Sequence, residues 1–92
     1  MDKTPEEILE ENGYEIEILQ EEETMFFRNP DYTSAIIGIS SDYHIIYSYD
    51  KMVEYLVSHD EMTIEEAVDF IDYNTLRAYT SKGKMPIVVY TF

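Results

Sequence analysis

The chain has 92 residues, a formal net charge of −14 and a hydrophobic content of 45%. This length suits a single small domain, and the apolar content favours a globular core over disorder. The chain contains no cysteine, which excludes disulfides and thiolate metal sites. Because acidic residues outnumber basic ones and apolar runs are short, we predict no direct nucleic-acid binding and no membrane span. We expect a cytoplasmic protein.

Residues 1–24 are predicted to form an acidic helix followed by a strand. Thr4 and Glu7 have the spacing of a capping box, so we expect a helix over residues 5–12. In the stretch YEIEIL, residues 14–19, apolar and acidic residues alternate from Tyr14 to Ile18, which is typical of a half-buried strand.

Residues 25–49 are predicted to contain strands with a hairpin. The short apolar stretch TMFF, residues 24–27, favours a strand, and the polar RNPDY that follows it favours a turn. The stretches SAIIGIS, residues 34–40, and YHIIYSY, residues 43–49, are the clearest strands. Because only a short polar segment separates them, we expect an antiparallel hairpin.

Residues 50–77 are predicted to form a helical hairpin, and residues 85–92 a final strand. Asp50 is expected to cap the first helix, and Thr63 is expected to cap the second in another capping box. The expected order is α-β-β-β-α-α-β in one α+β domain over residues 1–92. We predict an antiparallel sheet of three to four strands with the helices packed on one face.

The second helix of this hairpin has two distinct faces. Its apolar residues recur at helical spacing and are expected to face the core: Ile64, Ala67, Val68, Ile71 and Thr75. Glu65, Asp69 and Asp72 recur at i, i+4 and i+7 on another face. They form either a solvated helix face or an acidic strip that imitates a phosphate backbone. Phe70 and Tyr73 either extend the core or anchor a partner.

No sequence pattern indicates an enzyme. The two histidines, His44 and His59, are not spaced with carboxylates as a metal site requires. The chain has no phosphate-binding loop, dinucleotide fingerprint or Ser-His-Asp arrangement. We therefore predict no catalytic residue, no cofactor and no metal. A pocket of convergent carboxylates would instead indicate a small enzyme.

The stretches AIIGI, YDKMVEYL, EEAVDFIDYNT and PIVVY form a distinctive set within residues 32–90. In these stretches the chain resembles a family of small acidic proteins of unknown function from gut bacteria, their phages and their mobile elements. The resemblance implies the fold and a mobile-element neighbourhood. It implies no reaction and no catalytic residues.

We therefore predict a non-enzymatic, acidic protein-binding module that is related to phages or mobile elements. It would inhibit a basic nucleic-acid-handling protein by nucleic-acid mimicry, as an anti-CRISPR or other anti-defence inhibitor does. The partner would be a basic protein surface. The partner-binding residues would be Glu65, Asp69, Asp72, Phe70 and Tyr73. The alternative is a homodimeric or antitoxin-like interaction domain that pairs through an edge strand, such as PIVVYTF, without mimicry.

Overall fold

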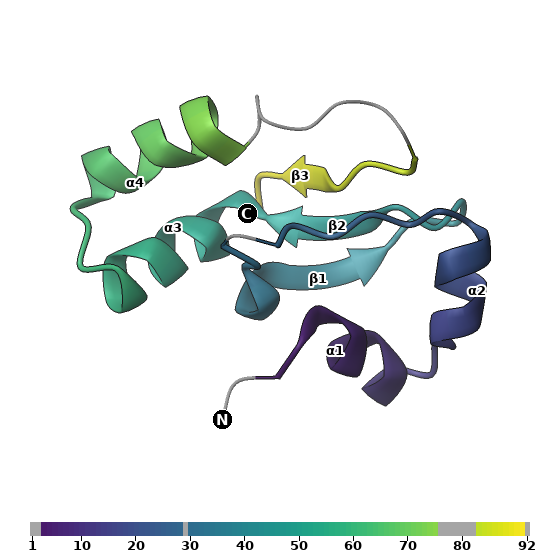
Figure 1. The fold of residues 1–92 in the computed structure, drawn as a ribbon. Coiled ribbons are helices and arrows are strands. Elements are labelled where there is room, and N and C mark those ends of the chain that lie inside the picture. Colours follow the sequence, from purple (N-terminus) through teal and green to yellow (C-terminus); the bar gives the residue numbers. More distant parts are fainter. Residues whose placement is uncertain (1–2, 29, 76–82, 92) are drawn as a thin grey trace.

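The computed structural model describes residues 3–28, 30–75 and 83–91. These residues form a small α+β domain in which helices pack against a three-stranded sheet (Figure 1), which confirms the predicted fold class. The elements in chain order are α1 (Pro5–Glu11), α2 (Ile16–Glu21), the 3₁₀ turn η1 (Thr33–Ala35), β1 (Ile36–Ile39), β2 (Ile45–Ser48), α3 (Tyr49–His59), α4 (Ile64–Phe70), the π-helical turn η2 (Ile71–Thr75) and β3 (Ile87–Val89).

The sheet is mixed rather than antiparallel, so this part of the prediction is wrong. β2 lies in the centre, with β1 antiparallel on one side and β3 parallel on the other. β1 and β2 form the predicted hairpin. β3 is parallel to β2 because a long connection that includes α3, α4 and η2 separates the two strands. Such a crossover returns the chain to the end at which the first strand began.

The second element of the chain is a helix, whereas the sequence predicted a strand over residues 14–19. α2 buries Leu19 and partly buries Ile16, three residues apart, as one helix face does. Tyr14 and Ile18, which a strand would have buried beside Ile16, are 38% and 37% exposed. Five residues of alternation are too few to exclude a helix, and the strongly helix-forming Glu, Leu and Gln that continue the stretch favour one.

The stretch after α2 is not a strand either, contrary to prediction. Thr24 makes only an isolated bridge to Lys84. Phe26 and Phe27 are both buried, whereas a regular strand would turn them to opposite faces. The Phe27 ring lies 4.6 Å from the Tyr47 ring, and the Phe27 N–H donates to the Tyr47 hydroxyl at 3.1 Å. The stretch therefore packs onto one face of the sheet.

The hydrophobic core lies on that same face. Ile45 and Tyr47 of β2 point into it and are fully buried. The helices and turns contribute further buried side chains to the same cluster: Leu9, Leu19, Tyr32, Ala35, Met52, Leu56, Ala67 and Ile71. The buried Tyr32 hydroxyl lies 2.8 Å from Thr75 Oγ1, which holds η2 against the core.

The helix starts follow the predicted capping chemistry with one shift. Thr4 and Thr63 each form a complete capping box, as predicted. Ser48, rather than Asp50, caps α3, because its hydroxyl accepts the Lys51 N–H while Asp50 lies in the first turn. The predicted helix end at residue 77 lies outside the described residues.

The α4–η2 segment buries most of its predicted apolar stripe. Ala67, Ile71 and Thr75 are buried, and Val68 packs against the core. Ile64 is the exception, with 67% of its surface exposed. It stands at the first position of the helix, so its side chain lies beyond the edge of the packed face.

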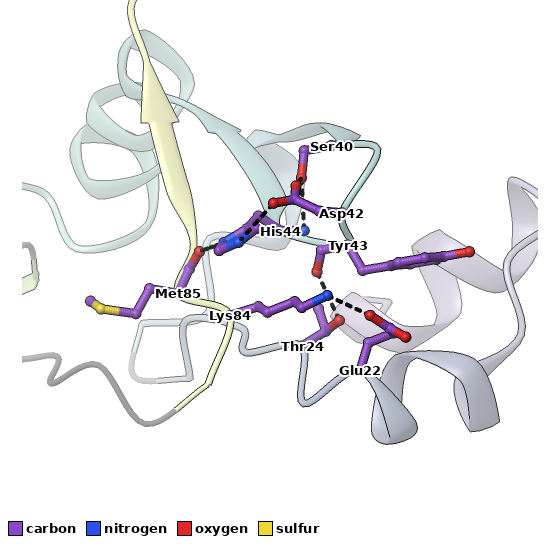
Figure 2. A network of polar contacts seen from close by, with 8 residues as sticks. All are labelled: Glu22, Thr24, Ser40, Asp42, Tyr43, His44, Lys84 and Met85. Carbon is purple, nitrogen blue, oxygen red and sulfur yellow. Dashed lines mark hydrogen bonds and ion pairs between the residues drawn. The ribbon is translucent and has the colours of Figure 1, made fainter.

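A polar junction fixes the place where the chain enters the last strand (Figure 2). The Met25 N–H donates to the Lys84 carbonyl and the Lys84 N–H to the Glu23 carbonyl, both at 3.0 Å. The Lys84 ammonium pairs with Glu22. His44 Nδ1 lies 2.7 Å from the Met85 carbonyl oxygen. These contacts join the end of α2, the hairpin turn and the approach to β3.

Gly83 is needed for the close approach at this junction. A Cβ atom at this position would lie 2.7 Å from the Glu23 carbonyl oxygen, whereas a Cβ at Gly38 would meet nothing within 4 Å. We expect Gly83→Ala to lower the free energy of unfolding by about 1–3 kcal/mol, because backbone must move to accept the methyl group. The matched control Gly38→Ala should cost little. Urea denaturation measures both variants, and equal stabilities would contradict the role of Gly83.

Candidate functional site

The outward side of α4 carries two carboxylates and an aromatic ring. Glu65 and Asp69 are both exposed. Tyr73 follows four residues later in η2 and is 64% exposed. Steps of four residues keep side chains on nearly the same side of a helix. We call Glu65, Asp69 and Tyr73 the α4 outer face.

Two of the predicted site residues lie elsewhere. Asp72 is half-buried and accepts a hydrogen bond from the Tyr49 hydroxyl at 3.0 Å. Phe70 is half-buried and packs against the core. The five candidate residues therefore divide into an exposed group of three, an acid engaged by α3 and a core side chain.

Asp72 belongs to a second group of side chains centred on Tyr49. The Tyr49 ring is 8% exposed, and its centroid lies 5.0 Å from that of Tyr90, which is 73% exposed. Burial raises the pKa of Tyr49 to about 12, helped by the hydrogen bond to Asp72 and by the negative charges of Asp72 and Asp69. We call Tyr49, Asp72 and Tyr90 the tyrosine cluster. Asp72 follows Asp69 by three residues, so this cluster adjoins the α4 outer face.

The acidic residues of the N-terminal segment are partly compensated. Lys3 pairs with Glu11 at 2.7 Å, and Arg28 pairs with Glu6 at 2.9 Å. The hydrogen bond from Arg28 holds the pKa of Glu6 below its usual value. Lys84 pairs with Glu22 in the junction described above.

The acidic residues of α4 lack such compensation within the described residues. Glu66 is engaged by its own capping box, in which the Thr63 N–H donates to its carboxylate at 2.9 Å and lowers its pKa. For Glu65 and Asp69, the described parts of the chain contain no Lys, Arg or His within ion-pair distance. Within the part of the chain that the structure describes, the α4 outer face therefore presents negative charge without a cationic partner.

The histidines lie apart from these surfaces. The His44 ring reaches the Met85 carbonyl, while the His59 ring stacks on Tyr55 with centroids 4.3 Å apart. Within residues 3–28, 30–75 and 83–91, no group of three His, Cys, Asp or Glu side chains is arranged to hold a metal ion. In the same residues, no helix is long and apolar enough to cross a membrane.

Comparisons with family models, curated proteins and solved structures found no match to this chain. The resemblance to small acidic proteins of gut bacteria and their phages stays a prediction. The surface itself must therefore carry any conclusion about function.

Sequence reasoning missed the tyrosine cluster. Tyr49 was predicted to end a strand, and Tyr90 was predicted to lie within one. Their partners are distant along the chain, since Asp72 lies 23 positions after Tyr49. The local pattern gives no sign of this pairing, because it depends on how α3, η2 and the end of β3 meet.

The Tyr49–Asp72 pair gives a measurable titration. We expect Asp72→Asn to lower the pKa of Tyr49 from about 12 towards 10, since an acceptor charge is lost while burial remains. The ¹³C chemical shift of the Tyr49 ring, followed by NMR as pH rises, reports this value. Glu65→Asn, which removes one charge from the same helix, is the control and should leave the Tyr49 titration in place. An unchanged Tyr49 titration in the Asp72→Asn variant would contradict the pairing.

The same pair has a consequence for stability. The folded chain holds the Tyr49 proton more tightly than the unfolded chain does, because the folded pKa is raised from 10.0 to about 12. This contribution to stability is fully present below pH 10 and is lost as pH rises towards 12.

Proposed function

We propose that the chain is a non-enzymatic, acidic protein-binding module that docks on a basic protein surface through the α4 outer face. The observation that carries this proposal is the exposed Glu65–Asp69 pair, which has no cationic partner among the described residues. Like charges at i and i+4 destabilise a helix slightly, so a surface that retains them is suited to an opposite charge supplied from outside.

The exposed tyrosines also suit binding to a basic protein surface. Tyr73 is 64% exposed beside Asp69, and Tyr90 is 73% exposed at the tyrosine cluster. Interfaces are enriched in tyrosine, whose ring buries apolar area while its hydroxyl makes hydrogen bonds. Arginine pairs with carboxylates and stacks on aromatic rings, so a surface rich in arginine fits both features. Asp72 would then support the face through Tyr49, and Phe70 would support it from the core side.

The most concrete form of this function is inhibition of a basic nucleic-acid-handling protein by nucleic-acid mimicry. Proteins that hold DNA or RNA expose Lys and Arg to bind phosphates, and carboxylates can occupy the same positions. The net charge of −14 gives a long-range attraction to such a surface. In this proposal the protein acts in the cytoplasm as an anti-CRISPR or other anti-defence inhibitor of a phage or mobile element.

An edge-strand homodimer is the second candidate. β3 lies at one edge of the sheet, so half of its backbone hydrogen-bonding groups point away from β2. A second copy pairing there would extend the sheet without any use of the acidic residues. Light scattering across micromolar concentrations distinguishes the two, because only the homodimer gives a mass that rises with concentration.

The main proposal is tested by removing charge from one helix at a time. The double variant Glu65→Gln/Asp69→Asn should weaken binding to a basic partner by about five- to thirtyfold, since each lost charge pair contributes up to about 1 kcal/mol. The matched control, Glu17→Gln/Glu21→Gln, removes two exposed acids at the same spacing from α2 and should bind almost as the native chain does.

The partner for this test is captured from host lysate on the immobilised chain and then purified free of nucleic acid. Binding is measured by biolayer interferometry at several salt concentrations. It should weaken steadily as salt rises, because ions screen exposed charges. Equal losses in the two double variants, or binding that does not depend on salt, would contradict docking through the α4 outer face.

A further inference from the structure

The face of the sheet opposite the core is apolar. Side chains alternate along a strand, so the burial of Ile45 and Tyr47 turns Ile46 to the other side. Ile87 pairs with Ile46 in β3 and takes the same side, and Val89 follows it two residues later. On β1, a bulge places Ile37 and Gly38 on the side opposite the core, while Ile36 and Ile39 face the core. We call Ile37, Ile46, Ile87 and Val89 the open sheet face.

These side chains are separate from the core cluster. Ile37 is 43% exposed and Ile87 is 37% exposed, while Ile46 and Val89 are half-buried between their neighbours. None of the four packs against the core, in contrast to Ile36, Ile39 and Val88 of the same strands. Isolated exposed apolar residues need no explanation, but a contiguous group across three strands marks an interaction surface.

Charge is absent from the open sheet face and present at both of its ends. The three strands and the residues that flank β2 and β3, at 44, 85–86 and 90–91, contain no Asp, Glu, Lys or Arg, although the chain carries a net charge of −14. At one end, the exposed Asp42 lies 3.5 Å from the His44 ring. At the other end, the exposed Asp50 accepts a hydrogen bond from Thr91 at 3.2 Å. A complementary partner is therefore apolar in its middle and basic at both ends.

The dimensions of this face indicate what can cover it. Three strands about 4.8 Å apart, of four, four and three residues at about 3.3 Å each, give a patch of at most roughly 14 by 13 Å. A stable dimer needs about 800 Å² from each copy, several times the area of this patch. One α-helix, with a diameter of about 10–12 Å, covers it.

We propose that the open sheet face binds one cationic amphipathic helix of a protein partner, with its apolar stripe on Ile37, Ile46, Ile87 and Val89 and its basic ends at Asp42 and Asp50. This rests on the proposed function in that the partner is basic, but it uses a different surface from the α4 outer face. Asp42 and Asp50 stand beyond the two ends of β2, whose four residues span about 13 Å. An amphipathic helix of about fourteen residues, roughly 21 Å long, extends past both ends of this strand.

The test uses a synthetic fluorescent peptide of about sixteen residues, with leucines at helical spacing and lysines at both ends. Its binding to the full chain is followed by fluorescence anisotropy. We expect Ile37→Thr/Ile87→Thr to weaken binding about tenfold or more, because threonine keeps the β-branched shape and loses apolar contact. The matched control Ile64→Thr alters an exposed isoleucine of α4 and should bind as the native chain does.

A second pair of variants separates this site from the α4 outer face. Asp42→Asn/Asp50→Asn keeps the hydrogen-bond acceptors towards Ser40 and Thr91 and removes the charges. It should weaken binding about three- to tenfold and flatten its salt dependence. Glu65→Gln/Asp69→Asn should leave peptide binding unchanged, so the proposed function and this proposal can fail independently. The Asn variants change exposed groups only, which keeps the test valid even if the threonine variants unfold.

Three outcomes would overturn the proposal. One is equal binding of a peptide with the same composition and a scrambled, non-amphipathic order, which would mean attraction by charge alone. Another is an equal loss of affinity in Ile64→Thr. The third is a mass in light scattering that doubles with concentration and returns to the monomer in Ile37→Thr/Ile87→Thr, which would make a second copy the occupant.

Discussion

The burial of Tyr47 in the central strand is the contact on which the arrangement of the domain depends. Its ring packs against Phe27, and its hydroxyl accepts the Phe27 N–H, so residues 24–28 are held on one face of the sheet. Its backbone register sets Ile36 on one side and Val88 on the other. Once Tyr47 and Ile45 point into the core, alternation along the strands decides which side chains form the opposite face. The open sheet face is thus a consequence of the core.

The distribution of charge also follows from which side chains face the core and which face solvent. Acidic residues lie on helices, turns and their connections, where water solvates them, and β1, β2 and β3 carry none. Some acids have structural roles: Glu7 and Glu66 complete capping boxes, and Glu22 pairs with Lys84. A small chain with this much negative charge repels itself, which favours arrangements that spread acids over the outside. Uncharged strands then leave one apolar surface on an otherwise acidic protein.

Local sequence chemistry predicted the parts of the fold that local forces determine. Both threonine capping boxes and the β1–β2 hairpin lie where the sequence placed them, because a few neighbouring residues satisfy the hydrogen bonds involved. The direction of β3 and the irregular path of Phe26 and Phe27 depend on contacts between distant segments, such as Lys84 with Glu23. Residues 14–19 were predicted as a strand because a short alternating stretch fits the spacing of a strand as well as that of a helix. The burial of Leu19 in the structure decides for the helix.

The candidate surfaces also contain one part that local sequence predicted and one part that depends on distant contacts. Helical spacing alone placed Glu65 and Asp69 together on an exposed side, and it could not show that Asp72 turns to Tyr49 across the interface between helices. The open sheet face could not be predicted, since its members come from three strands whose order includes a parallel pair. The apolar character of each strand was clear, but a strand pattern does not say which face is covered.

The claim that most needs measurement is that the sheet has one covered and one open face. A neutral gadolinium probe in the solvent enhances the relaxation of exposed methyl groups. The relaxation of the isoleucine methyl groups in the free chain therefore measures directly how exposed each face of the sheet is. Ile37 and Ile87 should relax almost as strongly as the exposed Ile64, whereas Ile45 and Ile71 should be protected. Protection of Ile37 and Ile87 equal to that of Ile45 would show that the face is covered and would contradict both the arrangement and the binding surface inferred from it.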